Sequence, residues 1–416
     1  MSLSSGPEKP AISLSRRGFL LGASALTIER STISSALGLK GNRNRQRMFA
    51  YVGTDTSAID GRANGQGIYL FEMNPSTGRL TLIKLAAETE NPSWLSAHPL
   101  EPYLYAVHQI ADFEGRSGSV SAYAIDRSNG DLRLLNTVSS QGAGPAHLSI
   151  DASGKYVFVA NYFGGSIAVL PILPGGILGS AIYMHQDQGS VGSKKSTDAP
   201  PGSYAFSGHD APHAHMIHSD PSNRFVLQTD LGQDRIYSYR LDDHTGKLAP
   251  APTPFVSLPP GDGPRHFAFH PNGQWLYSIQ EEASTVVFFH FDPATGSLVS
   301  QQTISTLPPG FAGTSFGSEI MLSGDGRFLY AANRLHNTIA IFSIDTNGKL
   351  IAIGETSTLG DYPSQFNIDP SGTFLYACNQ RSDQITSFRI DKETGLLTFT
   401  GQYVPVGSPT CIIFTI

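Results

Sequence analysis

Short apolar stretches alternate with turns rich in Pro, Gly, Asn and Asp from residue 48 to the C-terminus. Residues 263–287, GPRHFAFHPNGQWLYSIQEEASTVV, contain the recurring phrase: an apolar stretch, a Pro-Asn-Gly turn, and a second apolar stretch with the pair Leu-Tyr. Short stretches bounded by residues that favour turns are typical of β-strands. The pattern therefore predicts an all-β fold for residues 47–416.

The phrase recurs in six full copies. They begin near Pro92, Pro145, Ala214, Pro264, Gly317 and Pro363. All but the second continue into a third apolar stretch and a turn of the type Asp-x-x-x-Gly-x-Leu, as in SYRLDDHTGKL. A period of roughly 45–55 residues is typical of the four-stranded blades of a β-propeller.

Two incomplete copies remain at the ends of the chain. Residues 407–416, GSPTCIIFTI, match only the first strand of the phrase, and the residues from MFAYVGT at 48–54 onward match only the later strands. Together they supply a seventh copy. A ring closed in this way removes exposed sheet edges, which would otherwise pair with other chains. We therefore expect a seven-bladed β-propeller of four-stranded blades whose N- and C-terminal strands share one blade.

Composition and charge narrow the choice of partner. The 416 residues are 40% hydrophobic and carry a formal net charge of −6. They contain no long basic stripe, which argues against nucleic acid as a partner. The two cysteines, Cys378 and Cys411, lie in apolar stretches, which indicates buried thiols rather than a disulfide framework. We expect a monomer without a cofactor.

The N-terminal residues follow a different pattern. Paired arginines at 16–17 precede an apolar stretch, residues 19–28, that is too short to span a bilayer. The segment resembles a bacterial twin-arginine export signal. We therefore expect residues 1–46 to be an export signal and linker. The mature chain would then act in the periplasm or outside the cytoplasm, without a membrane span; if the signal is not used, the protein is cytoplasmic.

Departures from the repeat identify a candidate site. In a propeller blade the first strand lines the channel and the second runs antiparallel beside it, so the start of the first and the end of the second share one mouth. Near the start of the first strand, most copies carry a small residue, and the exceptions are His215 and Arg265. The residues at this first position are Ser93, Ala146, His215, Arg265, Ser318, Ser364 and Thr410.

A second position, just past the second strand, has charged exceptions at Glu281 and Arg334. The residues at this second position are Thr54, Gln109, Tyr162, Leu231, Glu281, Arg334 and Gln380. All four exceptions fall in the third to fifth copies, whereas structural drift would scatter them. We therefore predict one site at one mouth. Polar residues near the first position are expected to bind substrate: His147, His213, His266 and Glu319.

Simpler explanations remain open for each residue alone. Arg265 and Glu281 could form a structural ion pair within one blade. His215 could be a buried histidine with satisfied hydrogen bonds, and Arg334 could be a solvated residue at the rim. The clustering of the four favours a functional site.

With these residues in view, the chain resembles the lactonase family of seven-bladed propellers, which includes 6-phosphogluconolactonases and fungal carboxy-muconate lactonizing enzymes. The resemblance covers about residues 48–416. It rests on the phrases YVGT at 51–54, PHAH at 212–215, GPRH at 263–266, SEI at 318–320 and NR at 333–334. It implies hydrolysis of a small anionic or polyhydroxylated lactone, with His215, Arg265, Glu281 and Arg334 as catalytic residues.

The chain departs from the family pattern in three respects. Residues 174–210 form a long insertion rich in Gly, Ser and Pro that leads directly into PHAH, so we expect it to overhang the same mouth. The sequence IQEE stands where the family commonly has Asn-Glu, so Glu282 competes with Glu281 for the catalytic position. The export signal also fits poorly with 6-phosphogluconolactone, which is a cytoplasmic metabolite.

Lactone hydrolysis needs a base for water, donors for the carbonyl oxyanion, and an acid for the ring oxygen. Either His215 or Glu281 could serve as base and then acid. Two arginine side chains suit an oxyanion, a carboxylate or a phosphate. The same set could also run in reverse and close a lactone by adding a carboxylate to an alkene. The sequence does not choose between these directions.

Two alternatives to this enzyme site are a metal site and a binding surface without catalysis. The histidines of residues 209–218, HDAPHAHMIH, could offer two metal ligands on one face of a strand. They lack carboxylate or cysteine partners at a set spacing, so we predict no metal site. A propeller can also be a binding platform without catalysis, but the charged cluster at the mouth favours an enzyme.

Overall fold

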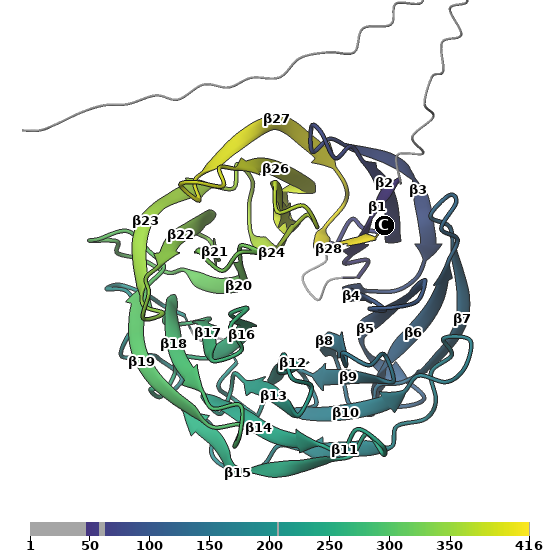
Figure 1. Cartoon of the computed structure of the whole chain (residues 1–416), viewed down its shortest axis with the longest axis horizontal. Coiled ribbons are helices and arrows are strands. Elements are labelled where there is room, and N and C mark those ends of the chain that lie inside the picture. Colours follow the sequence, from purple (N-terminus) through teal and green to yellow (C-terminus); the bar gives the residue numbers. More distant parts are fainter. Residues whose placement is uncertain (1–46, 58–62, 206–207, 416) are drawn as a thin grey trace, which may run out of the picture. The chain divides into compact units, whose positions relative to one another are not determined.

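The computed structural model describes residues 47–57, 63–205 and 208–415. They form seven four-stranded sheets, which follow one another as blades around a central axis (Figure 1). The prediction of an all-β, seven-bladed propeller is therefore confirmed. The predicted export signal, residues 1–46, lies outside the described residues. In the part of the chain that the structure describes, no helix is long and apolar enough to cross a membrane.

We number the blades 1 to 7 by their inner strands, which lie nearest the axis in Figure 1. The inner strands are, in this order, β4 (Pro92–Ala97), β8 (Pro145–Ile150), β12 (Ala214–Ser219), β16 (Pro264–Phe269), β20 (Phe316–Leu322), β24 (Pro363–Ile368) and β28 (Pro409–Thr415). The second strands are β5 (Tyr103–Phe113), β9 (Tyr156–Asn161), β13 (Phe225–Asp230), β17 (Trp275–Gln280), β21 (Phe328–Arg334), β25 (Phe374–Asn379) and β1 (Met48–Thr54).

The two remaining strands of each blade lie farther from the axis. The third strands are β6 (Ser117–Ile125), β10 (Ser166–Pro171), β14 (Arg235–Leu241), β18 (Thr285–Phe291), β22 (Thr338–Ile344), β26 (Gln384–Ile390) and β2 (Gly67–Met73). The outer strands are β7 (Leu132–Ser139), β11 (Tyr183–Gln186), β15 (Leu248–Ser257), β19 (Leu298–Ser305), β23 (Leu350–Ser357), β27 (Leu397–Pro405) and β3 (Leu80–Glu88). A short 3-10 helix, η1 (Gln380–Ser382), follows β25.

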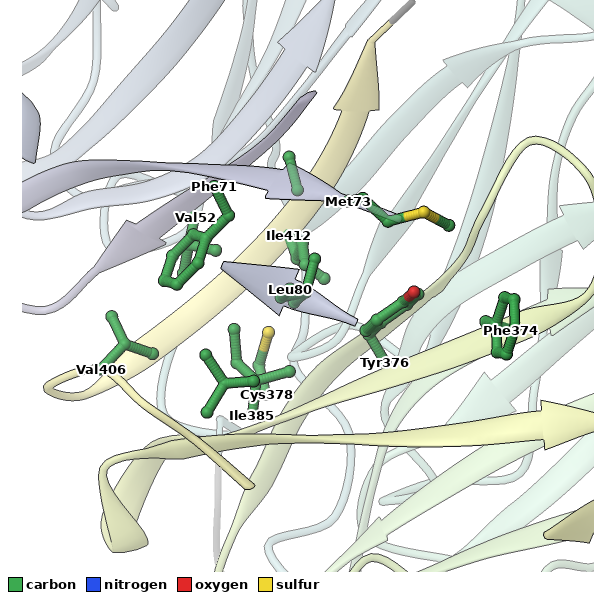
Figure 2. Close-up of a cluster of buried hydrophobic side chains, with 12 residues drawn as sticks. Val52, Phe71, Met73, Leu80, Phe374, Tyr376, Cys378, Ile385, Val406 and Ile412 are labelled. Atoms are coloured by element: carbon green, nitrogen blue, oxygen red, sulfur yellow. The ribbon is translucent and has the colours of Figure 1, made fainter. Parts of the chain in front are cut away.

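Blade 7 combines strands from both ends of the described chain. Its sheet has the order β28-β1-β2-β3, and β28 pairs antiparallel with β1, with Ile412 opposite Val52. Figure 2 shows Val52, Phe71 and Ile412 of blade 7 in one apolar cluster with Tyr376 and Ile385 of blade 6. The shared blade that the terminal fragments predicted is therefore confirmed.

Tyrosines of the second strands fasten several blades to the blade that follows. In each case the hydroxyl group donates a hydrogen bond of 2.7–3.0 Å to a glycine carbonyl in an outer turn. These pairs are Tyr51–Gly130, Tyr105–Gly176, Tyr277–Gly348, Tyr330–Gly395 and Tyr376–Gly78. The aspartate that begins most of these turns shapes them, as where Asp126 Oδ1 accepts the Ser128 N–H at 2.8 Å. The hydrogen bonds between these tyrosines and outer turns thus join neighbouring blades of the ring.

The start of every inner strand is irregular. Its register with the second strand shifts there, as between Pro264 and His266, which face Gln280 and Ile279. A bulged residue such as Arg265 has no partner in the ladder, and the bend re-aims its side chain. The residues within these bulges include Ser93, Ala146, His215, Arg265, Ser318, Ser364 and Thr410. The first position of the sequence repeat is therefore the bulge.

Candidate active site

The two positions meet at one mouth of the channel. They line a cavity of about 590 Å³, which we call the upper cavity. Its lining includes every residue of the first position except Ser318, and every residue of the second except Thr54 and Leu231. The predicted sharing of one mouth by strand starts and strand ends is therefore correct.

One carboxylate joins two arginines in this cavity. Glu281 Oε2 lies 3.1 Å from Arg265 Nε and 2.6 Å from Arg334 Nη2, and all three side chains are about nine-tenths buried. Arg265 Nη1 also donates to the Ser318 carbonyl at 2.6 Å, and Arg334 Nη2 donates to the Gly317 carbonyl at 3.0 Å. Because Arg334 comes from blade 5 and the other two from blade 4, the group is more than an ion pair within one blade. Its net charge of one positive unit suits an anion or oxyanion.

The two arginines remain charged despite burial. Burial and the neighbouring Arg334 lower the pKa of Arg265 to about 10, although Glu281 opposes this shift. Burial also acts to lower the pKa of Arg334, but Glu281 outweighs it and raises the pKa above its ordinary value. Arg334 Nε has no hydrogen-bond partner among the described residues. It is therefore a buried donor that a ligand could satisfy.

His215 lies beside these charges and lines the upper cavity. Its ring centroid is 5.4 Å from that of Tyr162 and 5.0 Å from that of His266. Burial, followed by the charge of Arg265, lowers the pKa of His215 well below its ordinary value, so the ring is neutral near pH 7. Its Nδ1 has no hydrogen-bond partner within the described ranges. His215 is therefore not a buried histidine whose hydrogen bonds are all satisfied.

Three residues that we expected to bind substrate contribute to a layer across the channel. His266 Nδ1 lies 3.1 Å from Glu319 Oε1, and the His147 ring centroid lies 4.6 Å from that of Trp94. Trp94 and His266 line the upper cavity, whereas Trp94, His147 and Glu319 line a lower cavity of about 720 Å³. Of the three expected residues, only His266 is placed to contact a ligand in the upper cavity.

His213 and Glu282 do not line the upper cavity. The His213 ring stacks on Tyr162 with centroids 4.3 Å apart, and its Nδ1 lies 2.8 Å from the Tyr162 carbonyl oxygen. Glu282 is 1% exposed, and its Oε1 lies 3.7 Å from His209 Nδ1. Of the two adjacent glutamates, it is Glu281 that faces the arginines of the cavity.

Residues 174–210 are only partly an insertion, because they contain β11, the outer strand of blade 2. The rest of the segment crosses the loops that lead into blades 4 and 5. Ser196 Oγ donates to Asp262 at 2.7 Å, and the Tyr204 N–H donates to Thr314 Oγ1 at 2.8 Å. Both loops precede inner strands, so the segment lies on the side of the expected mouth. None of its described residues lines the upper cavity.

A buried carboxyl pair anchors the start of this segment and predicts a pH effect on stability. Burial and Asp230 raise the pKa of Asp187 from 3.8 to about 9, although Gln228 donates to Asp187. The folded protein thus binds a proton that the unfolded chain has already released, so the free energy of unfolding falls as pH rises from about 4 to 9. Asp187→Asn should flatten this slope in denaturant titrations at several pH values. An unchanged slope would contradict the assignment.

Tyr362 is a cavity residue that the sequence analysis missed. Arg334 Nη1 donates to its hydroxyl oxygen at 3.3 Å, and Arg381 Cζ lies 3.7 Å from its ring centroid. Its φ of 62° is in the left-handed region, a conformation that the equivalent residues of four other blades share and that bulky side chains rarely adopt. The residues before proline at the same point of four other blades are Asn91, Gly144, Gly263 and Ser408. A tyrosine among such small residues was a signal available in the sequence.

The histidines of residues 209–218 separate in the folded chain. His209 Nε2 lies 3.1 Å from Asp234 Oδ1, whereas His213 stacks on Tyr162 and His215 lines the upper cavity. Within the described ranges, no three His, Cys, Asp or Glu side chains lie together so that they could hold a metal ion.

Comparisons with known proteins agree with the seven-bladed fold. The sequence profile described as "Lactonase, 7-bladed beta-propeller" matches residues 49–414. A 6-phosphogluconolactonase of Bacillus subtilis strain 168 is 34% identical over 369 residues, which are 88% of this chain and 98% of the relative. An uncharacterized protein of Staphylococcus aureus strain N315 is 32% identical over 88% of this chain and 99% of its own.

Solved structures show the same likeness. A Bacteroides fragilis protein is 33% identical with a TM-score of 0.79, covering 90% of this chain and 99% of that one. The periplasmic gluconolactonase PpgL of Pseudomonas aeruginosa is 30% identical with a TM-score of 0.77, covering 89% of this chain and 99% of that one. The profile match and the relatives, which extend over nearly the whole propeller, lead to one assignment: this chain belongs to the lactonase family of seven-bladed β-propellers.

Proposed function

We propose that this chain hydrolyses the lactone of a sugar acid and that the reaction takes place in the upper cavity. The observation that carries the proposal is the buried arginine pair that shares Glu281 Oε2. The group itself carries one net positive charge, and the cavity is also lined by Asp55, Asp361 and Arg381 and by Ser, Thr and Gln side chains. Such a cavity suits a small polyhydroxylated or anionic lactone. The relatives named 6-phosphogluconolactonase and gluconolactonase support the same substrate class.

The charges suggest how the ring is opened. When water adds to the lactone carbonyl, negative charge develops on the carbonyl oxygen, where Arg265 and Arg334 would stabilise it. Glu281 Oε2 is already shared by both guanidinium groups, so we assign Glu281 to positioning the arginines rather than to taking a proton. The proton acceptor is then one of the two neutral histidines of the cavity, His215 or His266.

The test is a pH-stat assay of proton release by the purified protein. The substrates are glucono-1,5-lactone, 6-phosphogluconolactone and muconolactone. Arg265→Ala is expected to lower kcat/KM by about 10²–10³-fold, as for the loss of an oxyanion donor. His215→Ala is expected to lower it about tenfold, as for the loss of one polar contact. The exposed His244→Ala serves as a control that should match the unmodified protein.

The relative rates on the three substrates define the activity further. We propose that unphosphorylated gluconolactone is preferred, because the twin-arginine segment would take the protein away from cytoplasmic sugar phosphates. A higher kcat/KM on 6-phosphogluconolactone would contradict this preference alone. Rates equal to the uncatalysed reaction on all three lactones would contradict hydrolysis of these substrates.

A further inference from the structure

A histidine–glutamate pair, His266 and Glu319, lies between the two cavities. His266, in β16, lines the upper cavity, and Glu319, in β20, lines the lower one. Both side chains are almost fully buried, and His266 Nδ1 lies 3.1 Å from Glu319 Oε1. The pair joins blades 4 and 5, the same blades that supply the two arginines and Glu281.

The hydrogen bonds around Glu319 indicate how the proton is placed on His266. Glu319 Oε1 also accepts the Ile320 N–H at 3.0 Å, and we assign the same oxygen as the acceptor of a hydrogen bond from His266 Nδ1. In the neutral ring the proton is then on Nδ1 and the lone pair is on Nε2. Burial raises the pKa of Glu319 to about 8, and burial together with Arg265 lowers the pKa of His266 well below its ordinary value. Near pH 7 the ring and the Glu319 carboxyl are therefore both neutral.

The His266 ring is held firmly, yet its Nε2 has no hydrogen-bond partner among the described residues. The ring centroids of His215 and Trp94, which also line the upper cavity, lie 5.0 Å and 5.1 Å away. Leaving a buried polar atom without a partner destabilises the fold, and such an atom in a native structure calls for an explanation. His266 also lines the upper cavity, where a water molecule or substrate is the partner that the proposal below assigns to this atom.

The two proton acceptors predicted from the sequence, His215 and Glu281, are less well prepared. No described side chain or carbonyl orients His215 through a hydrogen bond to Nδ1, and Glu281 Oε2 is shared by two guanidinium groups. A base that is itself held by a third group is the usual arrangement of a catalytic base. His266 meets this condition through Glu319.

We propose that His266 is the general base of the lactone-opening reaction and that Glu319 is the residue that positions it. This assignment rests on the proposed function. His266 Nε2 takes one proton from water, and the water oxygen bonds to the lactone carbonyl carbon. The resulting oxyanion re-forms the carbonyl as the bond from this carbon to the ring oxygen breaks. The ring oxygen takes the proton from Nε2 as it leaves. Lactone and water thus give a hydroxy acid, which releases its own carboxyl proton to solvent.

The test compares kcat and KM of single and double variants on the lactone that the unmodified protein hydrolyses fastest. His266→Asn keeps a donor toward Glu319 but removes Nε2, and should lower kcat by about 10²–10⁴-fold with KM within about threefold. Glu319→Leu removes the acceptor for Nδ1 and should lower kcat by about 10–100-fold, as expected for a residue that orients a reacting group. His218→Asn, which lies in the lower cavity, is the matched control and should retain the original kcat.

Two further measurements separate positioning from a structural role. If Glu319 acts through His266, the double variant should be no slower than His266→Asn alone, because residues that act as one unit are not additive. Added imidazole should restore turnover to His266→Ala in a saturable way, and should not do so for Glu319→Leu. Thermal unfolding curves are used to check that each variant is folded.

The outcomes are distinct. If the unmodified protein is active but His266→Asn keeps kcat within threefold, or if the losses of the two single variants multiply, the base assignment is wrong while the lactonase proposal stands. If the unmodified protein hydrolyses none of the lactones, the proposed function fails and the base assignment fails with it.

Discussion

Replacing Glu281 with glutamine is expected to lower the free energy of unfolding by about 3–5 kcal/mol, the usual cost of removing one partner from a buried ion pair. The carboxylate contacts Arg265 at 3.1 Å and Arg334 at 2.6 Å, and it is 8% exposed. Without it, two positive charges face each other where water cannot screen them. The change should be measured by guanidinium chloride unfolding followed by tryptophan fluorescence, with Trp94 as a probe in the cavity wall.

Two comparisons isolate the cause of that loss. Glu72→Gln removes the carboxylate of an exposed ion pair with Arg47, and should leave the free energy of unfolding unchanged within error. The double variant Arg265→Met with Glu281→Gln removes one charge of each sign, and should be more stable than Glu281→Gln alone, because the repulsion between the arginines is gone. If the double variant is less stable than Glu281→Gln alone, the loss comes from packing rather than charge.

Most of the fold was predictable because the same pattern of apolar strands and turns recurs from blade to blade. The paired apolar stretches recur in every full copy and the Asp-Gly turn in all but the second, and the terminal fragments complement each other, so the number of blades and the closure follow from counting. Cys378 and Cys411 are buried free thiols, as their apolar surroundings predicted. The outer strand β11 was not predicted, because blade 2 lacks the Asp-Gly turn and its strand lies within a Gly-rich segment.

Site residues whose positions are set by one strand could be predicted from the sequence. Those whose positions depend on packing between several strands could not. The bulge at the start of each inner strand aims one residue at the mouth, so His215 and Arg265 could be found by alignment of the copies. Whether Glu281 or Glu282 reaches the arginines depends on how the turn after β17 is oriented, which the alignment does not contain. The separation of His147 and Glu319 from the upper cavity depends on how His266 and Trp94 pack across blades.

Removing β28 by ending the chain at Ser408 is expected to abolish the native propeller. This strand pairs with β1 along its length, and its Ile412 and Cys411 each belong to a separate apolar cluster. Its loss leaves an unpaired β1 edge, which can pair with other chains, and opens two clusters at once. We expect the truncated protein to aggregate and to show no cooperative unfolding transition in circular dichroism or size-exclusion measurements.

Smaller changes in the same strand show whether closure itself matters. Ile412→Ala should lower the free energy of unfolding by about 2–5 kcal/mol, the cost of a cavity in a packed core, yet leave a cooperative transition because the β1–β28 ladder remains. Ending the chain at Thr415 keeps the whole of β28 and should match the full-length protein. If the chain ending at Ser408 unfolds cooperatively near the midpoint of the full-length protein, six complete blades suffice and the shared blade is not what holds the ring together. If instead it fails while Ile412→Ala remains cooperative, the ring depends on pairing the two ends of the chain, and not on any one apolar contact between blades 6 and 7.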